Sequence, residues 1–271
     1  MRVALGQLDC RVGDKRANEQ RLGEAIAEAR SAGADLLVVP ELQLSGYAPS
    51  PEDGDSASTV DELAAVLSGS GLATLVGFHE RANGVAHNSA GYFEGDALVH
   101  LHRKLYLCDY PPFDEDARFV PGETMRAFDT ALGRMATLIC NDAWQPFLPP
   151  LAVHDGARVL LVPAASPTLT PGIEGFWREL TRFYARMLEC YVVFVNRVGT
   201  EGAFRFWGGS HVVDPAGDIV AEIRSDEEAV VVAELDLDRV ESRRRALPLL
   251  RDLRPELLRA ELGRLASKGA R

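Results

Sequence analysis

The stretch that decides the fold is RMATLICNDAW, residues 134–144. Its apolar and small residues predict a buried strand, because the run lacks helical periodicity and is too short to span a membrane. We expect the strand to stop at Cys140, since the Asn-Asp pair that follows favours turns. Ligands bind at the carboxyl ends of strands in open α/β sheets, so this thiol is a candidate nucleophile. A buried structural cysteine is the alternative interpretation.

Outward from this stretch, strands alternate with helices. Strands are expected at 3–8, 35–39, 73–78, 87–93, 97–102, 158–163, 191–195, 211–213, 219–223 and 229–235. Helices are expected after Asp14, at 60–67 and at 174–189, and the tail from about residue 240 is also expected to be helical. The alternation predicts an α/β layered fold with a mixed sheet, in one domain spanning 1–271.

Composition narrows the class of protein. The formal net charge of −11 argues against nucleic acid or an anionic membrane as a partner. The four cysteines are far apart in sequence, which fits neither a disulfide framework nor a zinc site and indicates a reducing compartment. The N-terminus is too polar for a signal peptide, and no apolar run is long enough to cross a bilayer. We therefore expect a cytoplasmic protein.

Three strand ends carry residues that suit acyl transfer: Glu41, Lys104 and Cys140. A thiol with a pKa of about 8.5 needs a base or a cation to become a nucleophile, and a carboxylate can take its proton. A fixed ammonium can then stabilise the oxyanion of the tetrahedral intermediate. Each residue alone also has a structural interpretation: Glu41 as a capping or solvated carboxylate, and Lys104 as an ordinary surface lysine. No histidine is needed for this chemistry.

Several short strings, in order along the chain, resemble the nitrilase superfamily of carbon–nitrogen hydrolases. The main strings are VPEL at 39–42 with SGY at 45–47, HRKL at 102–105 and LICND at 138–142; the supporting ones are GFHE at 77–80, NSA at 88–90, VNRVG at 195–199 and GGS at 208–210. The resemblance implies a four-layer α-β-β-α sandwich that stacks into a dimer. It also implies catalysis by a Glu-Lys-Cys triad through a thioester, without a metal or organic cofactor.

The resemblance assigns roles to individual residues. Glu41 is implied as the general base, Lys104 as the transition-state stabiliser and Cys140 as the nucleophile. Glu115 occupies the place of a second glutamate that would hold Lys104 charged and in position, with a loop carboxylate among Asp114, Glu115 and Asp116 as the alternative. The backbone N–H of Asn141 is implied as the second oxyanion donor. The resemblance also implies a pocket ringed by Tyr47, Tyr110, Trp144, Ala165 and Phe176. The alternative interpretation of each is an ordinary core residue that does not contact the substrate.

Within the superfamily, the strings at 105–116 look most like the glutaminase domains that supply ammonia to NAD synthetases. Two features depart from them: Asn141 stands where those domains have an acidic residue, and 163–169 lacks an arginine to bind an α-carboxylate. The preferred substrate is therefore an uncharged or apolar amide, hydrolysed by a free-standing amidase. Nitriles, N-carbamoyl amines, acyl transfer to an acceptor other than water and docking on a separate synthetase stay open. For the homodimer, the expected interface is the helical face from Phe176 to Met187 and the tail.

Overall fold

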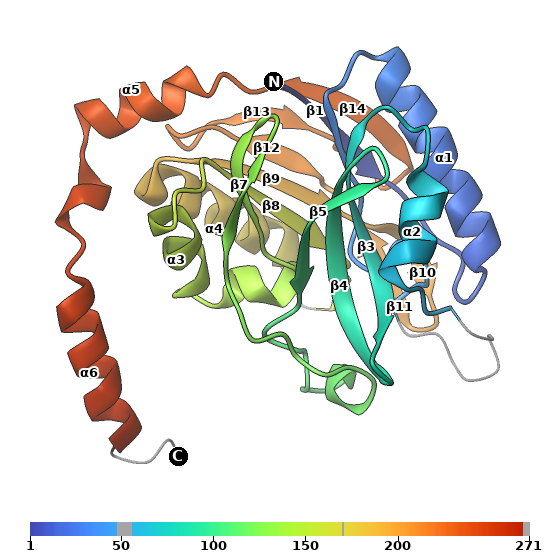
Figure 1. Cartoon of the computed structure of the whole chain (residues 1–271), viewed down its shortest axis with the longest axis horizontal. Helices are drawn as coiled ribbons and strands as arrows, with labels where there is room; N and C mark the ends of the chain where they lie inside the picture. Colours follow the sequence, from blue (N-terminus) through green and yellow to red (C-terminus); the bar gives the residue numbers. More distant parts are fainter. Residues whose placement is uncertain (48–55, 170, 268–271) are drawn as a thin grey trace.

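The computed structural model describes residues 1–47, 56–169 and 171–267. Two six-stranded sheets form its centre (Figure 1). The first has the order β14 (Ala229–Glu234), β1 (Arg2–Gln7), β2 (Leu36–Val38), β3 (Ala73–Ala82), β4 (Val85–Glu94) and β5 (Ala97–Arg103). The second has the order β13 (Ile219–Glu222), β12 (His211–Val213), β9 (Tyr191–Asn196), β8 (Val159–Ala164), β7 (Gly133–Thr137) and β6 (Ala127–Thr130).

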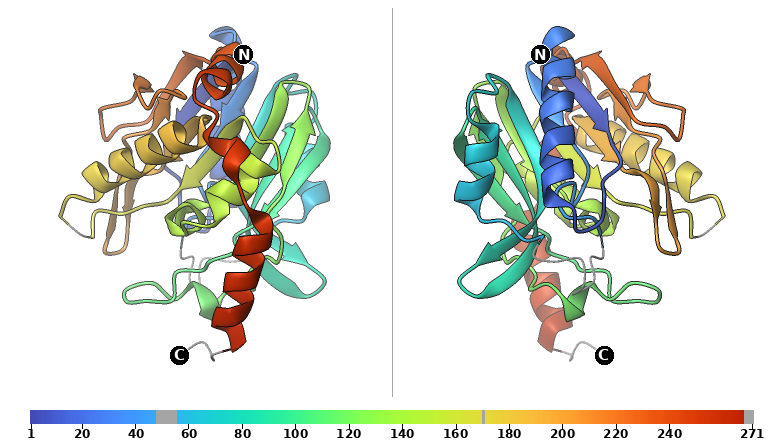
Figure 2. Two further views of the ribbon diagram at one scale, coloured as in Figure 1. Left: turned by 90° about the vertical axis from the view of Figure 1, so that its left-hand side faces the viewer. Right: turned by 90° about the vertical axis from the view of Figure 1, so that its right-hand side faces the viewer.

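The sheets pack face to face and helices cover their outer faces, so the predicted four-layer α-β-β-α sandwich is confirmed (Figure 2). Helices α1 (Lys15–Ser31) and α2 (Val60–Leu67) lie on the first sheet, and α3 (Leu148–His154) and α4 (Ile173–Leu188) on the second. Side chains alternate as this layering requires: Leu36 and Val38 belong to the core between the sheets, whereas Leu37 and Val39 pack with α1 and α2.

Both sheets are mixed, with three adjacent parallel strands in each. In the first sheet, β1, β2 and β3 are parallel, and β4 and β5 follow as antiparallel hairpins. Because two reversals restore the direction, β5 runs parallel to β2, and the residues after β2 and β5 emerge at the same edge. In the second sheet, β7, β8 and β9 are parallel, so Cys140 and Ala165 also follow parallel strands. This arrangement collects the residues expected to be catalytic.

Local sequence explains where α1 and α2 begin. The Asp14 side chain accepts a hydrogen bond from the Ala17 N–H at the start of α1. Thr59 and Glu62 form a capping box at the start of α2. The predicted limits of α2 agree with the structure, and those of α4 differ by one residue at each end.

Some expectations differ from the structure. The strand before Cys140 ends at Thr137, and a 3₁₀ turn, η3 (Cys140–Trp144), begins at the cysteine itself. The sequence patterns missed β6, α3 and the hairpin of β10 (Val198–Glu201) and β11 (Phe204–Trp207). On α4 the buried face carries Trp177, Thr181, Tyr184, Ala185 and Leu188. The helical face from Phe176 to Met187, expected as a subunit interface, is mostly exposed and not packed in the core, with exposed fractions of 43% for Phe176, 57% for Phe183 and 45% for Met187.

The tail is helical, as expected, in α5 (Asp238–Ala246) and α6 (Pro255–Ser267), with a short 3₁₀ turn η4 (Leu249–Asp252) between them. Val240 on α5 is fully buried, whereas α6 has no buried residue and extends away from the body (Figure 1). Its leucines are exposed; they are Leu257, Leu258, Leu262 and Leu265.

Candidate active site

Glu41 lies in the turn after β2 and is almost fully buried. Its Oε1 accepts hydrogen bonds from Lys104 Nζ and Asn88 Nδ2, each at 2.7 Å. Its Oε2 accepts one from the backbone N–H of Ala165 at 2.8 Å, across the gap to the second sheet. The carboxylate is therefore held at both oxygens, one by the first sheet and one by the second.

Gly77 on β3 makes room for this turn. A Cβ at Gly77 would lie 2.3 Å from Pro40 O and 2.8 Å from Glu41 Cα. A side chain here would displace the backbone that carries the carboxylate. The close approach of this turn to β3 is the physical reason for the glycine in the GFHE string.

Lys104 follows β5 and is fixed by its backbone as well as its side chain. Its N–H donates to Asn88 O and its carbonyl accepts from Gly122 N, both at 2.8 Å. Its Nζ lies 2.7 Å from Glu41 Oε1 and from Glu115 Oε1. Burial by itself lowers the pKa of Lys104, but the two carboxylates outweigh it and hold that pKa well above its usual value. The ammonium is thus charged in a site closed to water.

Glu115 is the member of the acidic trio that faces inward. It is fully buried in η2 (Glu115–Ala117), whereas Asp114 and Asp116 are exposed. Its Oε1 accepts from Lys104 and from the Tyr47 hydroxyl, and its Oε2 accepts from Cys108 N at 2.9 Å. The alternative of a solvated loop carboxylate is excluded by these contacts.

Cys140 begins η3 with a φ of +45°, a left-handed conformation that is strained for a residue with a side chain. Burial raises the pKa of its thiol well above the usual value, Glu41 raises it further, and Lys104 lowers it only in part. The thiol is therefore protonated at neutral pH. It needs a base before it can act as a nucleophile.

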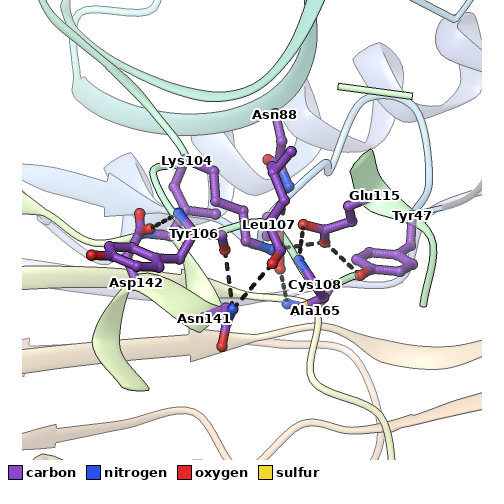
Figure 3. A network of polar contacts seen from close by, with 12 residues as sticks. Tyr47, Asn88, Lys104, Tyr106, Leu107, Cys108, Glu115, Asn141, Asp142 and Ala165 are labelled. Atoms are coloured by element: carbon purple, nitrogen blue, oxygen red, sulfur yellow. Dashed lines mark hydrogen bonds and ion pairs between the residues drawn. The ribbon is translucent and has the colours of Figure 1, made fainter. Parts of the chain in front are cut away.

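Asp142 ties this turn to the lysine segment, a connection that the sequence patterns did not reveal. Its Oδ1 accepts from the N–H groups of Leu105 and Tyr106 at 2.9 and 3.0 Å. Its Oδ2 accepts from Ile139 N at 3.1 Å and lies 2.9 Å from His102 Nε2. One buried carboxylate therefore holds the residues beside Cys140 against those beside Lys104 (Figure 3).

A cavity of about 700 Å³ opens above Cys140. Of the residues predicted to ring it, Tyr47, Tyr110, Trp144 and Ala165 line it, and so does Asn141, the expected oxyanion donor. Phe176 does not; its ring packs against Trp144 at 4.4 Å between centroids, and the neighbouring Trp177 lines the wall instead. The sequence patterns missed several other wall residues, namely Cys108, Pro111, Pro112, Phe113, Gln145, Ser166, Pro167, Leu169 and Ile173.

Asn141 also contacts the lysine segment, since its Nδ2 donates to Tyr106 O at 3.1 Å.

Within the ranges that the structure describes, no group of three or more His, Cys, Asp or Glu side chains is placed to bind a metal ion. No helix among those residues is long and apolar enough to cross a bilayer.

Proteins with similar sequences include amidases and synthetases. N-carbamoylputrescine amidase of Arabidopsis thaliana is 29% identical over 260 residues, which cover 88% of this chain and 87% of that protein. The glutamine-dependent NAD(+) synthetase of Thermotoga maritima is 30% identical over 248 residues, but these cover 88% of this chain and only 42% of the synthetase.

Among solved structures, an amidase of Nesterenkonia sp. AN1 superposes with a TM-score of 0.80 at 28% identity, covering 96% of this chain and 99% of that one. It is a glutamate-to-glutamine variant with acrylamide added at the active-site cysteine. Residues 2–245 match the carbon–nitrogen hydrolase family model. The chain therefore belongs to the carbon–nitrogen hydrolase family, in the nitrilase superfamily, and is a hydrolase of non-peptide carbon–nitrogen bonds.

Proposed function

We propose that the chain hydrolyses small amides through a thioester on Cys140 and releases ammonia or an amine. The observation that carries this proposal is the Lys104 ammonium, bound to both Glu41 and Glu115 beneath a cavity with Cys140 in its wall. A buried cation between two carboxylates is costly as a purely structural feature, whereas an acyl-transfer site uses it at each step.

The first half-reaction forms the thioester. Glu41 takes the proton of Cys140, and the thiolate sulfur forms a bond to the carbonyl carbon of the amide. The carbonyl oxygen becomes an oxyanion, which Lys104 and the backbone N–H of Asn141 stabilise. The C–N bond then breaks, and the protonated Glu41 gives its proton to the departing nitrogen. Ammonia or an amine leaves.

The second half-reaction restores the enzyme. Glu41 takes a proton from water, whose oxygen attacks the thioester carbonyl, and the C–S bond breaks to release a carboxylic acid. The thiolate recovers the proton from Glu41. Glu115 is a positioning residue in both halves, because its contacts with Lys104 and Tyr47 hold the ammonium in place.

The test is an ammonia-release screen over primary amides, nitriles and N-carbamoyl amines, with the Cys140→Ser variant beside the unchanged chain. We expect turnover of amides by the unchanged chain and loss of turnover in the variant. Full activity of Cys140→Ser, or no covalent labelling of Cys140 by a reactive amide analogue, would contradict the proposal. Turnover confined to nitriles or to carbamoyl compounds would assign the same site to those substrates.

A second candidate function is ammonia supply to a separate synthetase, supported by the likeness to the Thermotoga maritima synthetase. Co-purification with a synthetase and glutaminase activity only in that complex would support it. Robust turnover by the isolated chain contradicts it.

We also propose a cytoplasmic homodimer. The four free, buried thiols suit a reducing compartment, and the exposed Phe183 and Met187 of α4 with the leucines of α6 suit a subunit interface. A monomeric mass by light scattering contradicts the dimer.

A further inference from the structure

Two aromatic pairs line the cavity that contains Cys140. Trp144 and Trp177 meet edge to face at 5.7 Å, and Trp177 is fully buried. Tyr110 meets Phe113 edge to face at 5.3 Å. Both pairs give the lining an apolar, aromatic character.

The polar side chains of the wall bond mostly to the protein. Asn141 Nδ2 donates to two backbone carbonyls, and Ser166 Oγ accepts from Trp177 Nε1 at 2.9 Å. None of the described residues that line the cavity carries a charge. The nearby carboxylates of Glu41 and Glu115 are both bound to Lys104 and do not line the cavity. Among the described wall residues, a charged group on a substrate would lose its hydration without finding a counterion.

The volume adds a second constraint. Cavities of about 300–1,000 Å³ hold small molecules with most of their surface buried, and this one, at about 700 Å³, is far larger than an acetyl group needs. A short acyl group would fill only a small part of this volume and would leave much of the apolar lining, which includes Leu169 and Ile173, uncovered. Apolar surface on the substrate is what these side chains can bind.

We infer, on the basis of the proposed function, that the substrate is the amide of an uncharged acyl group with an extended apolar or aromatic part. The cavity walls select against acyl groups that carry a carboxylate or an ammonium. This separates the chain from a glutaminase, because glutamine carries both charges on its acyl part.

The inference is tested with amides of matched length: hexanamide, the monoamide of adipic acid and 6-aminohexanamide, with 4-phenylbutanamide and acetamide beside them. We expect kcat/KM for hexanamide and 4-phenylbutanamide to be at least about 100-fold higher than for either charged amide. We expect it to be about 10-fold higher than for acetamide. Equal or better turnover of a charged amide overturns the inference and leaves the proposed function standing. No turnover of any amide overturns both.

Variants that introduce a charge into the cavity wall test the same inference by changing the protein instead of the substrate. Leu169 lines the cavity and is 42% exposed, so Leu169→Arg is expected to fold. It should raise the ratio of adipic monoamide to hexanamide turnover at least about 10-fold by supplying the missing counterion. Ile173→Arg provides a second position on the wall. Val220→Arg, at an exposed position on β13 outside the cavity, is the control and should leave the ratio unchanged. An unchanged ratio in both cavity variants overturns the inference.

Discussion

Two regions of opposite character meet at Cys140. Below it, Glu41, Lys104 and Glu115 form a buried cluster joined by hydrogen bonds and ion pairs of 2.7 Å. Above it, the cavity is walled by aromatic and aliphatic side chains, and no described wall residue is charged. The lower region holds its side chains by several hydrogen bonds each, as bond-making chemistry requires, whereas the upper region supplies apolar area. Chemistry and selectivity are therefore separable by mutation.

The largest effect is expected for Cys140→Ala, which removes the group shared by both regions. We expect kcat to fall at least about 10⁴-fold, because no thioester can form. Ammonia release from hexanamide, with circular dichroism as a control for folding, measures it. Appreciable residual turnover would mean that the chemistry does not belong to this sulfur.

Glu41→Gln changes only the lower region. It should slow turnover and, at the same time, make the Cys140 thiol easier to ionise. We expect kcat to fall about 10³-fold, because the base is lost. The pKa of Cys140 should fall as well, since the Glu41 carboxylate is one of the groups that raise it. Alkylation of Cys140 by iodoacetamide, followed from pH 6 to 10, should therefore reach half of its maximal rate at a lower pH in the variant. A shift to higher pH would contradict the electrostatic arrangement.

Asp142→Ala tests the link that holds the cysteine turn against the lysine segment. The N–H groups of Leu105 and Tyr106 would lose their acceptor, so we expect the free energy of unfolding to fall by about 2–4 kcal/mol. We expect kcat to fall about 10²-fold, because Cys140 and Lys104 are no longer held in their relative positions. Urea unfolding and ammonia release measure the two effects. Asp142→Asn keeps an acceptor for these N–H groups, so it is the matched control and should lose less stability.

The two regions also differ in how far the sequence predicted them. Glu41, Lys104 and Cys140 follow strands, and strand ends at one edge converge whatever lies between them, so they could be identified from local strings. The contact between His102 and Asp142 joins residues 40 positions apart, and neither residue type marks it locally. The fold was predictable from its long periodic elements, whereas α3, whose first turn contains prolines, showed no clear pattern.

The cavity wall was less predictable because helical periodicity does not fix which of two adjacent aromatics faces inward. Phe176 and Trp177 are one residue and therefore about 100° apart around α4, so choosing one or the other decides which ring meets the substrate. The sequence pattern favoured Phe176, but the structure buries Trp177 and leaves Phe176 43% exposed. Selectivity residues of this kind depend on packing between elements.

Trp144→Ala changes only the upper region and should act on binding. We expect KM for hexanamide to rise about 10-fold with kcat changed less than about threefold, because the lost apolar contact is the same in the ground state and the transition state. Steady-state kinetics on hexanamide and acetamide measure it, and acetamide, which has less apolar surface to bury, should be less affected. A fall in kcat with KM unchanged would contradict the separation of the two regions.

The smallest effect is expected for Phe176→Ala, which removes the ring behind Trp144 without touching the cavity. Since Trp144 also packs against Trp177, its ring should stay close to its position, and KM should rise no more than about threefold with kcat unchanged. Phe147→Ala, at a ring that is 63% exposed and outside the wall, is the matched control and should change neither constant. If Phe176→Ala raised KM as much as Trp144→Ala, the ring would contribute to substrate binding, and the wall would extend one residue further along α4 than the cavity indicates.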